Sequence, residues 1–280
     1  MTPLLKWPGG KRLLAERIRR VFDGPVPLNG WYIEPFAGSL SVYLHRYSLG
    51  EVQPVRAILA DNNPRLMAFY RGLRRQPDYL AEVLAELPSG EGWKAAFAGL
   101  RADLNARQIT PVETGSPQFC AQYLWYNHAC FNGLMRVNGS GALNAPAGSY
   151  ETLTLPSLAE IQAVAKALLE AVLLTTPFSG LLPRQNAQIY CDPPYAGGWV
   201  GYTKEGFSYR DQLELALWAD RTRQQNNTVV VSNADCLEIR ALYPGLGFEV
   251  RELQAARSIS CTIPGREPAA ELLLVGRPCA

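Results

Sequence analysis

The sequence lacks the residue groupings that build zinc sites and disulfide frameworks. Its 280 residues include 6 cysteines and 2 histidines, whereas zinc sites and small disulfide scaffolds need closely spaced ligands or cysteine pairs. The cysteines are scattered over positions 120, 130, 191, 236, 261 and 279. Residues 1–6 have no apolar signal core, so secretion is not expected. We therefore expect no bound metal and a reducing, cytoplasmic compartment.

Long apolar runs and a strong charge bias are also missing. The most apolar stretch, residues 163–176, is interrupted by Lys166 and Glu170, and it is shorter than the roughly 20 residues of a membrane span. The 27 basic side chains nearly balance the 25 acidic ones, for a net charge of +2. We expect no membrane association. Basic residues do gather within residues 6–20, which leaves nucleic acid an open partner.

Short apolar and β-branched segments alternate with helical patterns through much of the chain. Alternation of this kind predicts an α/β fold with a mostly parallel sheet covered on both faces. In such sheets, functional residues lie at the carboxyl ends of the strands. The expected strands are residues 31–34, 57–60, 172–176, 189–191, 229–231, 247–253 and 271–275.

Residues 64–170 break this alternation. Apolar residues recur there at helical spacing, in residues 66–73, 79–87, 93–104 and 119–127. A loop at 129–150 follows, rich in glycine and asparagine but interspersed with apolar side chains, and irregular stretches of this length are usually functional. We predict that residues 1–63 and 171–280 form the sheet domain, and that 64–170 form a mainly helical insertion with an ordered loop.

The segment Cys191-Asp192-Pro193-Pro194-Tyr195 directly follows an expected strand. Its position puts the Asp192 carboxylate in the crevice above the sheet. The prolines have no N–H group, so the turn offers mainly carbonyl acceptors, and Tyr195 adds a flat ring. Two acceptors beside a ring suit a planar substrate with an exocyclic amino group. A rigid loop whose aspartate caps a neighbouring helix is the alternative that the segment alone leaves open.

Two further turns have the pattern of a nucleoside site. The turn at 34–39 contains Gly38, and small residues between a strand and a helix let the backbone approach a ligand. Asp61 ends the next strand about 20 residues further on, where a carboxylate can accept both hydroxyls of a ribose. A ligand-free strand-to-helix turn, and an aspartate that only initiates the turn at 61–64, remain the alternatives.

In their order along the chain, these motifs resemble the Dam-type DNA adenine methyltransferases, over about residues 4–275. The matching segments are 5–11, the Gly-loop 34–39, the acidic turn 60–63, the recognition-loop pieces 132–136 and 144–148, the Asp-Pro-Pro-Tyr motif 192–195, and 257–260. The resemblance implies a Rossmann-like sheet that binds S-adenosylmethionine (SAM), with a target-recognition insertion at 64–170. It also implies methyl transfer to the exocyclic amine of a flipped-out adenine in double-stranded DNA.

The resemblance assigns roles to individual residues. The catalytic set is Asp192, Pro193, Pro194 and Tyr195; the cofactor set is Trp7, Lys11, Glu34, Phe36, Gly38, Asp61 and Asp192; the DNA set is Phe131, Asn132, Leu134, Arg136 and Arg257. Lys6 and Arg12 are expected at phosphates. Lys11 is expected to meet the methionine carboxylate of the cofactor.

Two positions depart from the family pattern. Leu40 stands where relatives often have a second glycine. Residues 175–178 differ from relatives, which often have after this strand an acidic or polar residue that touches the cofactor's adenine; Thr176 or the backbone there could substitute.

An exocyclic amine is a poor nucleophile because its lone pair is delocalised into the ring. If the Asp192 carboxylate and the Pro193 carbonyl accept its hydrogens, they favour a tetrahedral nitrogen and stabilise the transition state. The base must first leave the duplex, and Tyr195 would stack on it. The same motif could act on the cytosine amine or on RNA, and a DNA-binding protein that has lost cofactor binding is a non-catalytic alternative. The recognised bases and a restriction partner are left open.

Overall fold

A computed structural model describes residues 1–7, 9–196, 207–255 and 269–279. In this part of the chain, a seven-stranded sheet has the order β3-β2-β1-β4-β5-β7-β6. Strands β1 to β5 run parallel, and β7 is antiparallel to both β5 and β6. The bounds are β1 Trp31–Glu34, β2 Ala57–Asp61, β3 Val172–Thr175, β4 Ala187–Cys191, β5 Thr228–Ala234, β6 Glu249–Ala255 and β7 Ala269–Gly276.

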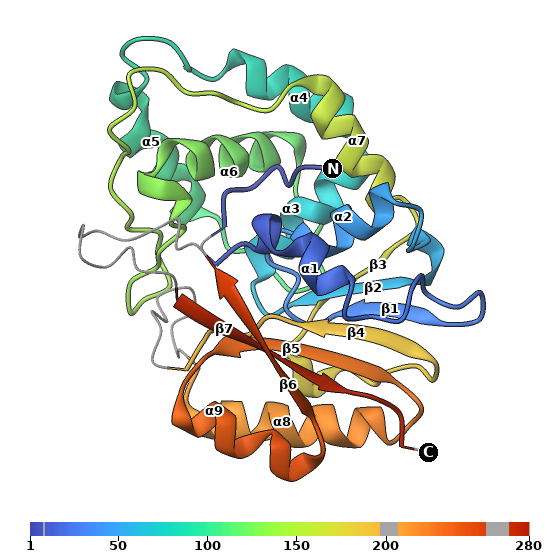
Figure 1. Ribbon diagram of the computed structural model, residues 1–280. Coiled ribbons are helices and arrows are strands. Elements are labelled where there is room, and N and C mark those ends of the chain that lie inside the picture. The colour runs from blue at the N-terminus through green and yellow to red at the C-terminus, as the bar shows by residue number, and fades with distance from the viewer. Residues whose placement is uncertain (8, 197–206, 256–268, 280) are drawn as a thin grey trace.

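Helices cover both faces of this sheet (Figure 1). One face carries α8 (Tyr209–Arg223) and α9 (Leu237–Leu242), and the other carries α1 (Ala15–Arg19), α2 (Ser41–Ser48) and α3 (Pro64–Arg75). Side chains of one strand therefore alternate between two apolar cores. Ile189 packs in the core beneath α8, whereas Tyr190 packs in the core on the opposite face. Every residue of β4 is buried, as expected for a parallel strand between two helical layers.

The expected mostly parallel sheet is confirmed. The strand expected at 31–34 forms with those bounds, and the ends of the other expected strands differ by up to three residues. The helices begin where the chain supplies caps. The Asn63 side chain accepts hydrogen bonds from the first turn of α3, which Pro64 opens. Ser208 and Asp211 form a capping box at the start of α8. None of the helices in the described ranges is long and apolar enough to cross a membrane.

The expected helices of the insertion form as α3, α4 (Pro77–Glu86), α5 (Lys94–Ala106) and α6 (Pro117–Ala129). A further helix, α7 (Leu158–Leu168), precedes β3. Helix α6 lies at the centre, packed against α3, α4 and α5, while α3 also packs against β2 and β3. The insertion and the sheet consequently share one continuous apolar core.

The expected ordered loop follows α6. Antiparallel bridges pair Cys130 with Ala147 and Val137 with Leu143, so that residues 130–147 form a hairpin, which we call the 130–147 hairpin. At its tip, the Asn138 side chain accepts hydrogen bonds from the main-chain N–H groups of Ser140 and Ala142. Such side-chain bonds to the backbone fix a tight turn without a packed core.

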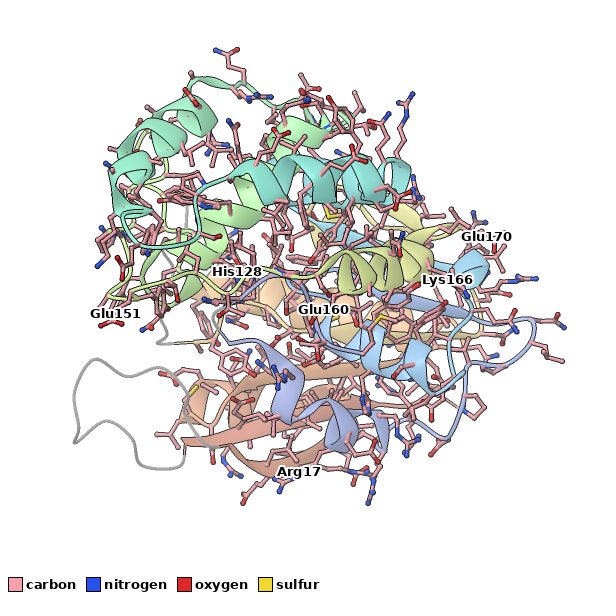
Figure 2. The ribbon with its side chains drawn as sticks, turned by 90° about the horizontal axis from the view of Figure 1, so that it is seen from above. Arg17, His128, Glu151, Glu160, Lys166 and Glu170 are labelled. Carbon is pink, nitrogen blue, oxygen red and sulfur yellow. The ribbon has the colours of Figure 1, made fainter. Side chains whose placement is uncertain are left out.

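The N-terminal segment is bound to the end of α6. The main chain of Lys6 exchanges two 2.8 Å hydrogen bonds with the Asn127 side chain. The imidazole of His128, labelled in Figure 2, lies between the carbonyl oxygens of Leu4 and Thr154, 2.8 Å from each. The contacts of Leu4 and Lys6 with α6 join chain segments more than 120 residues apart.

Candidate active site

The carboxyl ends of β1, β2 and β4 enclose a cavity of about 540 Å³. Strand order reverses between β1 and β4, because β2 and β3 follow on one side of β1 and β4 lies on the other. Ligands of open α/β sheets bind at such a switch point. The lining residues include Trp7, Lys11, Glu34, Phe36, Gly38, Asp61, Asp192, Pro193, Pro194 and Tyr195. All predicted catalytic and cofactor residues are therefore brought together.

The Gly-loop requires a glycine at position 38 for both its backbone conformation and the space beside it. Gly38 has φ +46°, and a Cβ atom added there would lie 3.0 Å from Trp7 Nε1. A side chain at this position would thus meet both a strained conformation and the indole. Leu40, the departure from the family pattern, has φ +62° and is fully buried. The left-handed geometry that suits glycine is kept here by leucine, whose burial offsets a conformational cost of about 1–2 kcal/mol.

Asp61 joins the Gly-loop to the turn after β2. Its Oδ2 accepts from the Gly38 N–H at 3.0 Å, and its Oδ1 accepts from the Asn63 N–H at 2.9 Å. Burial raises the pKa of this carboxyl, while the hydrogen bonds from the main chain act in the opposite direction. Asp61 therefore does take part in the turn at 61–64. This role does not displace the ligand interpretation, because each oxygen has a second lone pair and the residue lines the cavity.

Lys11 forms an ion pair with Asp192. We call residues 192–196, which contain the predicted catalytic set, the catalytic turn. The lysine Nζ lies 3.0 Å from Asp192 Oδ1 and 4.8 Å from the centre of the Tyr195 ring. Only 4% of the lysine side chain is exposed, against 22% for the aspartate. Burial raises the pKa of Asp192, and Lys11 lowers it. A paired ammonium therefore favours the ionised carboxylate in a site that otherwise disfavours charge.

Glu271 is a cavity residue that the sequence interpretation treated only as part of a strand. It lies on β7, and its Oε2 accepts a 2.9 Å hydrogen bond from the Tyr195 hydroxyl. The available signal was a carboxylate within an otherwise apolar strand. Because β7 is far from the motif in sequence, its approach to Tyr195 follows from the sheet order and not from any local pattern.

Aromatic side chains form one wall of the cavity. The Phe36 ring lies 5.6 Å from that of Phe178 and 6.0 Å from that of Phe207, measured between ring centres. Phe178 follows β3, within the second departure from the family pattern. Thr176 is absent from the cavity lining, whereas Pro177, Phe178 and Ser179 belong to it. This wall suits a planar ligand.

Carboxylates dominate the charge of the cavity. Among the described lining residues, the acidic ones are Glu34, Asp61, Asp192, Asp211, Glu214 and Glu271, and the sole lysine or arginine is Lys11. Burial raises the pKa of Glu34 to about 8, although a 2.5 Å hydrogen bond from the Tyr32 hydroxyl opposes the shift. Even with Glu34 neutral, the lining favours a cationic ligand. Nowhere in the described ranges do three His, Cys, Asp or Glu residues group to hold a metal.

Four of the five predicted DNA residues lie on the 130–147 hairpin. Phe131 and Arg136 are exposed, while Asn132 and Leu134 are partly buried. The Arg136 guanidinium is oriented by Asn144, donating from Nε to Oδ1 at 2.8 Å and from Nη2 to the main-chain oxygen at 3.2 Å. Arg257 lies outside the described residues.

The N-terminal segment connects this hairpin to the cavity. A Cβ atom added at Gly133 would lie 2.3 Å from Lys6 Cβ, so the hairpin backbone rests directly on Lys6. The next residue, Trp7, contacts Gly38, and Lys11 reaches Asp192. The Lys6 ammonium donates to the His128 carbonyl at 3.2 Å and lies 4.7 Å from the Tyr150 ring centre. One short segment therefore touches the hairpin, the Gly-loop and the catalytic turn.

Comparison with known proteins identifies the family of the chain. A family model for D12 class N6 adenine-specific DNA methyltransferases matches residues 7–259. A DNA adenine methylase of Vibrio cholerae is 32% identical, covering 98% of this chain and 95% of the relative. A DNA adenine methylase of Serratia marcescens is 30% identical, covering 98% and 97%. A type II methyltransferase of Methanocaldococcus jannaschii is 28% identical, covering 93% of each.

The resemblance to DNA adenine methyltransferases is thus confirmed, and with it a methyltransferase activity that requires a methyl donor and a DNA substrate. The fold, the cavity at the strand ends and the family match all agree. The chain belongs to the D12 class of N6 adenine-specific DNA methyltransferases.

Proposed function

We propose that the chain is a site-specific enzyme that uses SAM to methylate the exocyclic amine of an adenine flipped out of duplex DNA. The observation that carries the proposal is that Asp192, Pro193 and Tyr195 line the same cavity as the Gly-loop. An extrahelical base placed there would present its amine to two acceptors and its face to a ring.

The cavity has the features that SAM requires. SAM supplies an electrophilic methyl group on a sulfonium cation, and the acidic lining of the cavity matches that charge. Gly38 permits close approach of the backbone, and Asp61 retains free lone pairs for ribose hydroxyls. Phe36 and Phe178 offer faces for the adenine ring. We place Trp7, Lys11 and Glu34 around the remainder of the cofactor.

Asp192 and Pro193 carry the chemistry of the amine. The carboxylate accepts one amine hydrogen and the Pro193 carbonyl accepts the other, which localises the nitrogen lone pair for in-line attack on the methyl group. Lys11 keeps Asp192 ionised, since it is paired with the carboxylate at 3.0 Å. Tyr195 stacks on the extruded base, and its hydroxyl is fixed by Glu271. Pro194 restricts the turn that holds these groups in place.

We place DNA recognition in residues 64–170, with the 130–147 hairpin as the part that reads the sequence. Arg136 is exposed and oriented to donate to a guanine edge. Phe131, 37% exposed, would enter the gap left by the flipped base, with Asn132 and Leu134 beside it. Lys6 and Arg12 contact phosphates, and Arg257 keeps the same proposed role. These contacts make binding dependent on salt.

Methylation of a mixed duplex library with labelled SAM tests the base and the cofactor together. We expect the label in N6-methyladenine after digestion to nucleosides, within one short sequence context. If the label were found in methylated cytosine, the target base would be cytosine and not adenine. A chain that neither binds SAM calorimetrically nor transfers label would be a non-catalytic DNA-binding protein, and the proposal would be withdrawn.

Replacing Arg136 with alanine should relax sequence choice more than it lowers turnover. Loss of a bidentate guanine contact removes about 1–3 kcal/mol of discrimination, or roughly 5- to 150-fold. The measurement is the ratio of kcat/KM for the cognate duplex to that for duplexes with one changed base pair. The control is Arg221→Ala, at an exposed position of α8. An equal loss on every duplex would assign Arg136 to a phosphate instead.

A further inference from the structure

Two buried amide side chains lie directly behind the catalytic turn. Gln212 comes from α8 and Asn233 from β5, and their exposures are 1% and 0%. The sequence resemblance gave neither residue a role. Buried amides are costly unless their polar atoms are hydrogen-bonded, so the partners of this pair identify what it holds.

Among the described residues, the side-chain hydrogen bonds of the pair lead to the turn or to the other amide, apart from one to the strand of Asn233 itself. Gln212 Nε2 donates to the Pro194 carbonyl at 2.8 Å. Gln212 Oε1 accepts from Asn233 Nδ2 at 2.9 Å. Asn233 Oδ1 accepts from the N–H of Ala196 at 3.1 Å, and from that of Ala234 at 2.9 Å. This series of hydrogen bonds therefore runs from the Pro194 carbonyl, through the two amides, to the N–H of Ala196.

The direction of each bond is fixed by chemistry. A carbonyl can only accept, so the amide group of Gln212 that faces Pro194 must be its NH₂. Its oxygen then faces Asn233, which must in turn present its own NH₂ there and its oxygen to Ala196. Reversing either amide would oppose two acceptors or two donors. The pair consequently specifies one position of the turn.

Together with Glu271, the pair holds the three residues 194–196 that come directly after Pro193. Pro194 is held through its carbonyl, Tyr195 through its hydroxyl, and Ala196 through its N–H. One lone pair of the Pro194 oxygen is thereby engaged by Gln212, and the Ala196 N–H donates to Asn233. The Pro193 carbonyl has no hydrogen-bond partner among the described residues, and it remains beside Asp192 as the main-chain acceptor.

We propose that Gln212 and Asn233 are positioning residues that set which main-chain groups of the catalytic turn face the target amine. This inference rests on the proposed role of Asp192 and Pro193, and deepens it. Displacing a reacting group by about 1 Å can lower a rate about 10²-fold. The pair should therefore affect the methyl-transfer step while leaving the cofactor side of the cavity intact, since neither amide belongs to the Gly-loop or to the turn after β2.

Two variants of Gln212 test the proposal. Gln212→Met removes both hydrogen-bonding ends of the side chain, and Gln212→Glu keeps the shape and the acceptor for Asn233 but loses the donor to Pro194. We expect each to lower kcat about 100-fold, with the KM for SAM and its calorimetric Kd within about threefold of the parent. The matched control is Gln224→Met, at the end of the same helix, where the amide donates to Asp220 on the surface.

A double variant distinguishes positioning from general stability. Gln212→Met combined with Asn233→Leu should be about as slow as the slower single variant, because residues that act as a unit are not additive. A kcat for Gln212→Glu within threefold of the parent, multiplicative losses in the double variant, or a matching loss of SAM affinity would overturn the proposal. Failure of both Gln212 variants to fold would overturn it too, because the pair would then be a stability element. A parent chain that does not methylate adenine would instead overturn the proposed function.

Discussion

Replacing Asp192 with asparagine is expected to lower single-turnover methyl transfer by at least about 10³-fold, because the proposed acceptor of an amine hydrogen is lost. Asparagine keeps the volume of the side chain, so the turn and its contact with Lys11 need not collapse. Its NH₂ group would face the amine as a second donor. Binding of SAM, measured by calorimetry, should stay within several-fold of the parent, since the Gly-loop and Asp61 are unchanged.

Asp192→Ala should give the same loss of transfer with a lower melting temperature. Removing the carboxylate leaves the Lys11 ammonium, 4% exposed, without its ionic partner, and an unpaired buried charge destabilises a fold. Glu214→Gln is the matched control, because it alters another carboxylate that lines the same cavity. Transfer by either Asp192 variant within tenfold of the parent would contradict the assigned role. Loss of transfer in the control as well would indicate a general electrostatic effect.

Local patterns were sufficient to predict the framework of this site. Asp192 directly follows β4, in which every residue is buried, as in a parallel strand covered on both faces. Asp61 ends β2, whose other residues are likewise buried. The carboxyl ends of neighbouring parallel strands lie at one edge, so the approach of these residues follows from the fold class alone. The helices of the insertion were predictable from a second local pattern, the recurrence of apolar residues at the helix period.

Local patterns could not predict the contacts between side chains that are far apart in the sequence. Lys11 was expected at the methionine carboxylate on family resemblance, while its observed partner is Asp192. Glu271 and Gln212 meet the catalytic turn through the sheet order and the placement of α8, which no short motif encodes. Leu40 shows a different limit, since a left-handed leucine depends on burial that the whole core provides.

Lys11→Met is expected to slow methyl transfer about 10²-fold at pH 7, and to make the loss depend on pH. Burial raises the pKa of Asp192 and Lys11 lowers it, so removing Lys11 raises that pKa further. A larger fraction of the carboxyl is then protonated at neutral pH, and a protonated carboxyl is a poorer acceptor. The acid side of the kcat profile should therefore move to higher pH, with partial recovery of the rate as the pH rises.

The same substitution should change the pH dependence of stability in the opposite sense to activity. An unpaired buried carboxyl with a raised pKa is tolerated while protonated, and its ionisation destabilises the fold as the pH rises through that pKa. The melting temperature of Lys11→Met should therefore fall relative to the parent towards alkaline pH. Glu34, with a pKa raised by burial to about 8, titrates in both proteins, so the effect is measured as the difference between the two profiles.

Lys166→Met is the matched control, since this exposed lysine of α7, labelled in Figure 2, is absent from the cavity lining. Neither its kcat profile nor its melting curve should move. If Lys11→Met lost activity equally at every pH, the ammonium would act by binding the cofactor carboxylate, and its Kd for SAM would rise in parallel. A shift of the acid limb at constant Kd instead requires that the lysine act through Asp192, the carboxylate with which it is paired at 3.0 Å.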